Sequence, residues 1–175
     1  MQIVNTKKVF VVHGRNDVAK REMFTFLWSI GLAPEEWIQA IELTGEASPF
    51  IGDVLNAAFS IAQAVVILLT GDDEARLRSE YQDEDDSDDE KNLTPQVRQN
   101  VLFEAGMAFG LQPKRTVLVE LGKVRPFSDV SGRHVVKLSN KTEKRLELAQ
   151  KLKNAGCAVD LSGDAWVNAG NFNIK

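Results

Sequence analysis

Cysteine and histidine are scarce in this 175-residue chain, which contains only Cys157, His13 and His134. A single cysteine excludes a disulfide framework and is typical of proteins kept in a reducing cytosol, so we expect a cytoplasmic protein. Two histidines and one cysteine cannot supply the ligand spacing of a zinc site. We therefore expect no metal site and no cofactor.

Long apolar runs are also missing. The longest, Ala64–Leu69, is far shorter than the roughly 20 residues that a membrane-spanning helix needs. The first residues lack the apolar core of a signal peptide, and basic residues form no stripe that would suit a nucleic acid. Hydrophobic residues make up 43% and charged residues 26% of the chain, a balance typical of globular proteins. We expect one domain over residues 1–175, with no membrane segment and no direct nucleic-acid binding.

Several motifs of nucleotide and ester chemistry are absent. No Gly-x-Gly-x-x-Gly follows the first predicted strand, which argues against a hydride-transferring Rossmann enzyme. No Gly-x-x-x-x-Gly-Lys-Ser/Thr is present, which excludes P-loop phosphoryl transfer, and no Gly-x-Ser-x-Gly nucleophile elbow occurs. A phospho-receiver domain needs an aspartate at the end of its third strand, where this chain has Leu69-Thr70-Gly71.

Acidic charge is concentrated in one segment. Eight of the eleven residues from Glu80 to Glu90 are acidic, and without them 17 acidic residues stand against 21 basic ones. Such a run repels itself and buries nothing, so we expect residues 80–92 to form a mobile loop that is dispensable for folding.

Hydrophobic periodicity predicts strands that alternate with helices. The predicted strands are Lys8–His13, Trp37–Leu43, Ala64–Thr70, Arg115–Leu121 and His134–Leu138. The predicted helices are Asp17–Ile30, Phe50–Gln63, one from Thr94-Pro95 to Gln112-Pro113, and Thr142–Asn154. This alternation indicates an α/β fold: a five-stranded parallel sheet of flavodoxin-like order 2-1-3-4-5, with helices on both faces.

Ligands of such sheets bind outside the carboxyl ends of the strands, near the switch in strand order. Gly14-Arg15-Asn16 follows the first predicted strand and Gly71-Asp72-Asp73 follows the third. These two turns are therefore expected at the same rim, bordered by the loop Thr44–Pro49. Asp72-Asp73 has the chemistry to bind a cation, although such pairs more often cap the next helix.

Glu104 is the only charged residue between Gln99 and Pro113. Thr94 and Pro95 have the residue types of an N-cap and a first helical position. The helix is predicted to have a buried apolar stripe formed by Val97, Val101, Ala105 and Ala108. Phe103, Met107 and Leu111 extend this stripe, so the helix is predicted to be apolar on most sides. An ionised carboxylate in this setting needs a partner or a shifted pKa. Glu104 is therefore either bonded to an arginine or a loop, or lines a cleft that receives a substrate.

Three motifs together resemble one known family. They are His13-Gly14-Arg15-Asn16, Leu68-Leu69-Thr70-Gly71-Asp72-Asp73 and Arg98-Gln99-Asn100-Val101-Leu102-Phe103-Glu104-Ala105-Gly106. The chain is similar to bacterial TIR-like (Toll/interleukin-1 receptor-like) domains of the predicted nucleotide-binding branch found in cyclic-nucleotide-activated, CBASS- or Pycsar-type, anti-phage effectors. Ser128–Gly132, Leu152–Gly156 and Gly170–Phe172 also match, so the likeness runs from about Lys8 to Phe172. The loop Thr44–Pro49 departs from the family's usual Asn-Gly-bearing loop.

The resemblance implies an NAD+ glycohydrolase that cleaves the nicotinamide–ribose bond, with NAD+ as substrate and Glu104 as the catalytic glutamate. It also implies a substrate site, for which we take the rim residues Gly14, Arg15, Asn16, Thr44, Gly71, Asp72, Arg98 and Asn100. Arg15 and Arg98 are expected at the diphosphate, although Arg98 is equally suited to a surface ion pair with the acidic loop. Other copies of the chain are expected to complete the pocket near Thr44–Pro49, and a cyclic-nucleotide sensor domain or partner protein to trigger assembly. A nucleoside deoxyribosyl- or base-exchange transferase and a non-catalytic TIR interaction module remain as alternatives.

Overall fold

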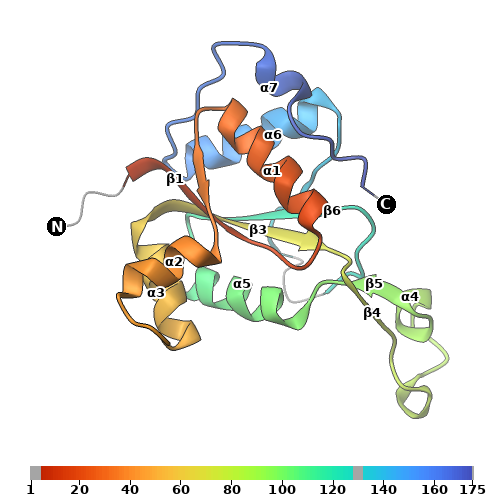
Figure 1. The fold of residues 1–175 in the computed structure, drawn as a ribbon. Coiled ribbons are helices and arrows are strands. Elements are labelled where there is room, and N and C mark those ends of the chain that lie inside the picture. The colour runs from red at the N-terminus through yellow and green to blue at the C-terminus, as the bar shows by residue number, and fades with distance from the viewer. Residues whose placement is uncertain (1–4, 128–131, 175) are drawn as a thin grey trace.

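A computed structural model, which describes residues 5–127 and 132–174, shows an α/β fold built on a five-stranded parallel sheet (Figure 1). The strand order is β2-β1-β3-β6-β7, which confirms the predicted flavodoxin-like topology. The five strands are β1 (Asn5–Val12), β2 (Ala33–Glu35), β3 (Ala62–Thr70), β6 (Thr116–Leu121) and β7 (Val136–Lys137). The main helices are α1 (Asp17–Ser29), α2 (Trp37–Thr44), α3 (Ile51–Ile61), α5 (Gln99–Leu111) and α6 (Thr142–Asn154). A short helix α7 (Ala165–Asn168) follows α6.

Helices cover both faces of the sheet, as predicted, because successive strand residues point to opposite sides. Val9 and Val11 pack with α1 and α6 in one core, and Phe10 and Val12 pack with α3 and α5 in the other. In Figure 1 the first pair of helices lies above the sheet and the second pair below it. Glu104 therefore belongs to the layer that also contains α2 and α3.

The second strand of the sheet is not the predicted one. Trp37–Leu43 forms helix α2, and the strand beside β1 is the shorter segment Ala33–Glu35. The β-branched and aromatic composition of Trp37–Leu43 favoured a strand, but its buried side is helical, since Trp37, Ala40 and Ile41 contact the core. Local signals for the helix were present: the Glu36 backbone N–H donates to the Gln39 side chain at 3.0 Å, and Gly45 ends the helix at a φ of +67°.

The predicted start of the Glu104 helix is also wrong. Thr94 and Pro95 belong to β5 (Thr94–Gln96), which pairs antiparallel with β4 (Asp73–Ala75) in a two-stranded ribbon outside the main sheet. Proline is tolerated there because a short ribbon leaves half of its backbone N–H groups unpaired. Helix α5 begins at Gln99, four residues after Pro95, with Arg98 as its N-cap residue.

Helix α5 is buried on one side only. The predicted buried stripe is confirmed, since its four residues belong to the core on that face: Val97, Val101, Ala105 and Ala108. Phe103 and Leu111 are exposed, so the prediction that the helix is apolar and packed on most sides is wrong. The helix therefore has a core-facing side, a solvent side, and between them the boundary at which Glu104 lies.

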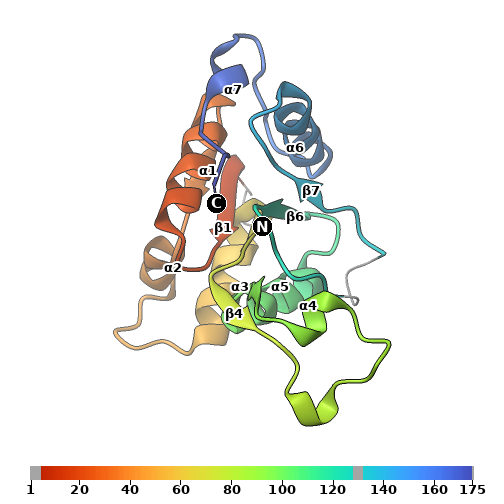
Figure 2. The same ribbon diagram turned by 90° about the vertical axis from the view of Figure 1, so that its right-hand side faces the viewer.

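Residues 76–93 form an arm that extends from the body beyond the β4–β5 ribbon (Figures 1 and 2). A 3-10 turn (Ser79–Tyr81) and the short helix α4 (Asp88–Lys91) lie within it. The Leu77 backbone N–H donates to the Glu90 carbonyl at 2.8 Å, and the Glu90 side chain forms an ion pair with Arg125. The arm is thus joined to the body at its base, and its mobility remains a prediction.

We expect replacement of residues 80–89 by a short Gly-Ser linker to change the thermal midpoint by less than about 4 °C. Glu90 is retained in this variant because its pair with Arg125 belongs to the base of the arm. The removed residues are exposed or half-buried and contribute no side chain to either core, so little apolar burial is lost. Calorimetry of the two proteins measures the change, and a fall of more than about 10 °C would show that the arm packs against the body.

Within the described residues, no helix is long and apolar enough to cross a membrane.

Candidate active site

Glu104 lines a small pocket at the carboxyl end of β1. The pocket has a volume of about 150 Å³ and is lined by Phe10, Val11, Val12, His13, Trp37 and Glu104. Helix α5 supplies the carboxylate, β1 the floor and the first turn of α2 the indole. Glu104 therefore lies at the rim predicted from the strand order, beside the residues that lead into the Gly14 turn.

The Glu104 carboxylate has no partner in the part of the chain that the structure describes. No ion pair reaches it, and no side chain or backbone N–H in residues 5–127 or 132–174 donates a hydrogen bond to it. Burial raises the pKa of this carboxyl from its ordinary value of 4.5 to about 7. The charged form is disfavoured because water is partly excluded and nothing replaces it. Perturbed carboxyls of this kind gather at functional sites.

His13 and Trp37 line the pocket, although the sequence analysis assigned no role to either. His13 Nε2 lies 3.3 Å from a Glu36 carboxylate oxygen, and the same oxygen accepts a hydrogen bond from Lys20 Nζ at 3.1 Å. This network holds the start of α2 against the end of β1 and so positions Trp37. The sequence feature that could have identified Trp37 is the helix start at Glu36. A helix that begins there directs the Trp37 side chain toward the sheet.

The two predicted glycine turns meet at the rim through Asp72. The Arg15 backbone N–H donates to Asp72 Oδ2 at 2.5 Å, and a Cβ on Gly14 would overlap the Asp72 carboxylate. Gly71 is equally confined, because a Cβ there would lie 2.5 Å from Pro95 Cβ and 2.8 Å from the Lys123 carbonyl oxygen. Asp72 therefore ties the β1 and β3 turns together, which leaves its role as a direct substrate ligand a prediction.

Arg98 and Asn100 frame the first turn of α5. Arg98 forms an ion pair with Asp73 at 3.1 Å rather than with the acidic arm, and both side chains are about one-third exposed. Exposed pairs of this kind contribute little and exchange readily. The aliphatic part of Arg98 lies near Gly14, so this cation belongs to the same rim. Asn100 is exposed one helical turn before Glu104.

Two other predicted substrate residues are engaged locally. Asn16 caps α1, because its Oδ1 accepts a hydrogen bond from the Ala19 N–H at 2.9 Å. Thr44 ends α2, where its hydroxyl donates to the Ile41 carbonyl at 2.8 Å. No described contact joins Thr44 to Glu104 or to the Asp72 turn. Thr44 can reach the Glu104 pocket of its own chain only if the following loop moves. Otherwise it can contribute only to the pocket of a neighbouring molecule.

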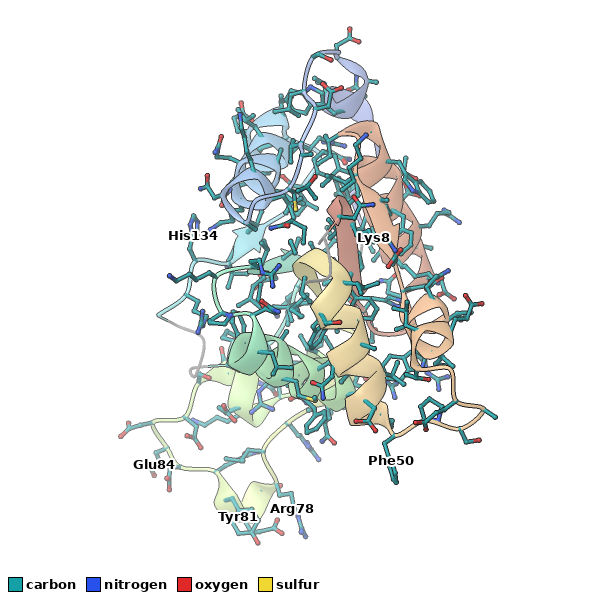
Figure 3. The ribbon with its side chains drawn as sticks, turned by 90° about the vertical axis from the view of Figure 1, so that its left-hand side faces the viewer. Lys8, Phe50, Arg78, Tyr81, Glu84 and His134 are labelled. Carbon is teal, nitrogen blue, oxygen red and sulfur yellow. The ribbon has the colours of Figure 1, made fainter. Side chains whose placement is uncertain are left out.

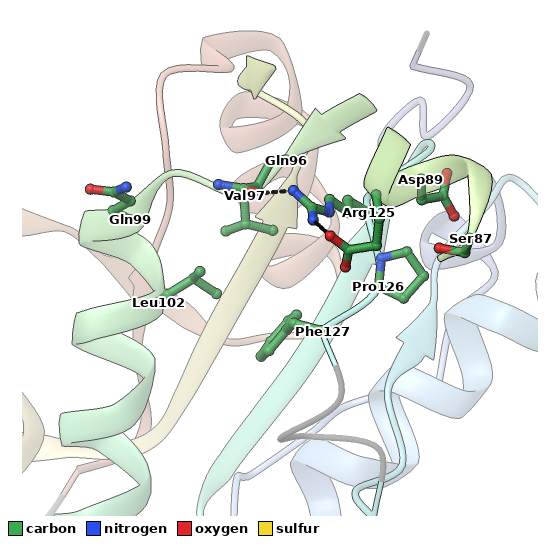
Figure 4. A pocket seen from close by; sticks show the side chains of 10 residues that line it. Ser87, Asp89, Gln96, Val97, Gln99, Leu102, Arg125, Pro126 and Phe127 are labelled. Atoms are coloured by element: carbon green, nitrogen blue, oxygen red, sulfur yellow. Dashed lines mark hydrogen bonds and ion pairs between the residues drawn. The ribbon is translucent and has the colours of Figure 1, made fainter. Parts of the chain in front are cut away.

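A larger pocket, of about 670 Å³, lies between the start of α5 and the base of the arm (Figure 4). Arg125 spans it, donating to Gln96 Oε1 at 3.4 Å and pairing with Glu90. Gln99 and Leu102 of α5 line its other side. Two acids line this pocket: Glu90, which is paired with Arg125, unlike Glu104, and Asp89 of α4. The pocket offers room for a ligand.

A protein-family model described as "CAP12/Pycsar effector protein, TIR domain" matches residues 8–140. The matched range contains the second half of β1 and all of α5, and it includes Gly14, Asp72 and Glu104. The resembling segments Leu152–Gly156 and Gly170–Phe172 fall beyond it, and Ser128–Ser131 lie outside the described residues. A search of curated proteins found no match.

Proposed function

This chain belongs to the TIR-domain family of CAP12/Pycsar effector proteins, which act in bacterial anti-phage defence, and we propose that it is an NAD+ glycohydrolase with Glu104 as its catalytic residue. The observation that carries the proposal is the unpartnered carboxylate in an aromatic-lined pocket at the carboxyl rim. A structural glutamate would have an arginine or a loop amide against it, and the described residues offer neither.

One carboxylate suffices for this reaction. Ordinary glycosidases use two, because one of them must protonate the departing oxygen. The nicotinamide of NAD+ is a cationic pyridinium that takes the electron pair of the C–N bond and departs neutral, so no acid is needed. Positive charge then develops on the ribose anomeric carbon, and water completes the hydrolysis there. A fixed anion in a pocket with little water stabilises that charge.

The pocket dimensions suit one end of a dinucleotide. A volume of about 150 Å³ is below the roughly 300–1,000 Å³ of pockets that enclose a drug-sized ligand. In our proposal the nicotinamide ring occupies it beside Trp37, the ribose lies at its mouth against Glu104, and the diphosphate extends along the rim. Arg15 and Arg98 then meet the diphosphate, with Arg98 exchanging its exposed pair with Asp73 for a phosphate.

The products formed from NAD+ test the reaction. We expect nicotinamide and an ADP-ribose product in equal amounts from the wild-type chain. An exchanged base in the presence of added free pyridine bases, without net hydrolysis, would instead indicate a transferase. Intact NAD+ under every condition, including forced clustering, would indicate a TIR interaction module without catalysis.

We further propose that copies of the chain assemble through the loop Thr44–Pro49. Large apolar side chains are exposed on both sides of this loop: Phe50 is 82% exposed, Ile38 63% and Ile51 61%. Figure 3 shows Phe50 directed away from the body. Exposed apolar groups that lie together typically mark a contact surface, and a neighbour there is suited to close a pocket that is small and open in one copy.

Forced clustering tests this assembly. Fusion of the chain to an inducible dimeriser is expected to raise the NAD+ cleavage rate per molecule at least tenfold, because a second copy completes the pocket. Phe50→Ser in the same fusion is expected to remove most of the gain, and Leu146→Ser, an exposed leucine on the opposite face, to leave it. A rate per molecule that is independent of concentration and of clustering would contradict the proposal.

A further inference from the structure

Basic side chains that the proposed site does not use line a pocket at the opposite end of the sheet. This pocket, of about 370 Å³, lies where β6 begins and α6 ends. Lys114, Arg133 and Lys151 line it, and we call it the basic pocket. The Arg133 guanidinium lies over the Phe109 ring, 3.9 Å from its centroid. The hollow therefore combines positive charge with an aromatic wall.

Among the described residues, the basic pocket has no internal counter-charge. No acidic residue is among its described lining residues, and no acid in residues 5–127 or 132–174 forms an ion pair with Lys114, Arg133 or Lys151. His134 also lines the pocket, and its Nε2 lies 3.1 Å from a Glu147 carboxylate oxygen. In a chain of net charge −4, three such cations around one hollow create a local field that attracts an anionic partner.

A run of exposed negative charge lies in the arm, after its 3-10 turn (Ser79–Tyr81). Asp83, Glu84 and Asp85 are consecutive and exposed, and no described base pairs with any of them; we call them the acidic tip. Two other acids of the arm are engaged, since Glu80 pairs with Arg78 at 2.6 Å and Glu90 with Arg125. The acidic tip therefore has charge available for a contact outside its own arm.

The acidic tip and the basic pocket are at opposite ends of one molecule. The arm follows β3 at its carboxyl end, whereas the pocket lies at the amino end of β6, and the register runs from Val65 opposite Thr116 to Thr70 opposite Leu121. Five steps of about 3.3 Å separate these ends by roughly 16 Å, and the arm projects still farther from the sheet (Figures 1 and 2). Figure 3 likewise shows His134 and Glu84 apart.

We propose that the acidic tip of one copy docks into the basic pocket of a second copy. The charges are complementary, which steers the encounter and fixes its register. The two surfaces differ, so the contact is heterologous, and repeating it adds copies in one direction instead of closing a two-fold dimer. The inference gives the acidic arm a role in the proposed activation by assembly, and it does not depend on NAD+ being the substrate.

Charge reversal tests the contact, with average mass from light scattering as the readout and no NAD+ present. We expect the wild-type mass to rise with concentration at about 0.01 M salt and to approach the monomer value at about 1 M, because the screening length falls from about 30 to 3 Å. Asp83→Lys with Glu84→Lys and Asp85→Lys makes the tip-reversed variant. Lys114→Glu with Arg133→Glu makes the pocket-reversed variant.

Each reversed variant alone is expected to associate at least tenfold more weakly than wild type, and an equal mixture of the two to recover association. A control variant with Asp17, Glu143 and Asp164 changed to Lys alters the net charge equally, and these three exposed residues lie outside the arm, the basic pocket and the Thr44–Pro49 loop. Unlike the tip-reversed variant, it is expected to assemble alone as wild type does. Circular dichroism establishes that each variant is folded.

Three results would overturn the proposal: wild-type protein that stays monomeric at low salt, a reversed variant that assembles alone as wild type does, or a folded mixture that fails to assemble. Loss of assembly with Phe50→Ser but with neither reversal would assign the contact to the Thr44–Pro49 loop. Because mass needs no substrate, these failures are distinguishable from a failure of the NAD+ proposal, which only product analysis detects. Repeating the mixture in the Glu104→Gln background is expected to leave assembly unchanged.

Discussion

Glu104→Gln is expected to reduce NAD+ cleavage by a hundred- to a thousandfold while the fold remains intact. The amide keeps the volume of the side chain and removes the negative charge that would stabilise the ribose cation. Loss of one such preorganised group costs roughly 3–4 kcal/mol of transition-state stabilisation. The measurement is the initial rate of nicotinamide release under the clustering condition that gives the highest wild-type activity.

Two variants control this experiment. Glu143→Gln, an exposed glutamate in the first turn of α6, is expected to retain the wild-type rate. Glu104→Asp keeps the charge but withdraws it by one methylene, so its rate is expected between those of wild type and Glu104→Gln. Nicotinamide release by Glu104→Gln at the wild-type rate would remove Glu104 from the mechanism.

Glu104→Gln is also expected to be more stable than wild type at pH 8.5 but not at pH 5. Burial raises the pKa of Glu104 to about 7 in the folded chain, from 4.5, so the folded protein holds this proton where the unfolded chain has lost it. The free energy of unfolding of wild type, relative to that of the variant, is therefore highest below about pH 4.5. It falls as the pH rises from about 4.5 to about 7 and is constant at higher pH. Discounted for partial exposure, the change is roughly 2–3 kcal/mol.

Unfolding free energies of the two proteins at pH 5, 7 and 8.5 measure this dependence. A buried glutamate paired with an arginine would give the opposite result, since Gln would then destabilise by about 3–5 kcal/mol at pH 8.5. The ionised form is the one that stabilises a cation, so kcat/KM for NAD+ is expected to rise as the pH increases through about 7. A pH-independent difference in stability would show that Glu104 is not desolvated as the structure has it.

The sequence alone determined the strand order and four of the five strands of the sheet. Apolar runs such as Ala64–Thr70 identified buried strands, and the helix Thr142–Asn154 was predicted with the bounds that the structure gives. These elements were readable because their local pattern and their tertiary burial agree. The glycine turns after β1 and β3 were placed at one rim by topology, and the Asp72 contact with the Arg15 N–H confirms that they meet.

Where the local sequence was compatible with either a helix or a strand, only the tertiary structure decided which of the two formed. Trp37–Leu43 has strand-like composition, but the edge beside β1 was taken by Ala33–Glu35, so the later segment coiled into α2 and brought Trp37 to Glu104. Thr94-Pro95 has helix-start chemistry, yet it pairs with β4 because a nearby strand offered it hydrogen bonds.

The environment of Glu104 shows the same division. The sequence showed that Glu104 is isolated among apolar neighbours. It did not decide between a carboxylate paired with a base and an unpaired one. The choice depended on whether any donor reached it through space: Arg98 turned to Asp73, and among the described residues no other base came within reach. Desolvation and the absence of a partner are properties of the packed chain, because contacts between distant segments create them and no local pattern records them.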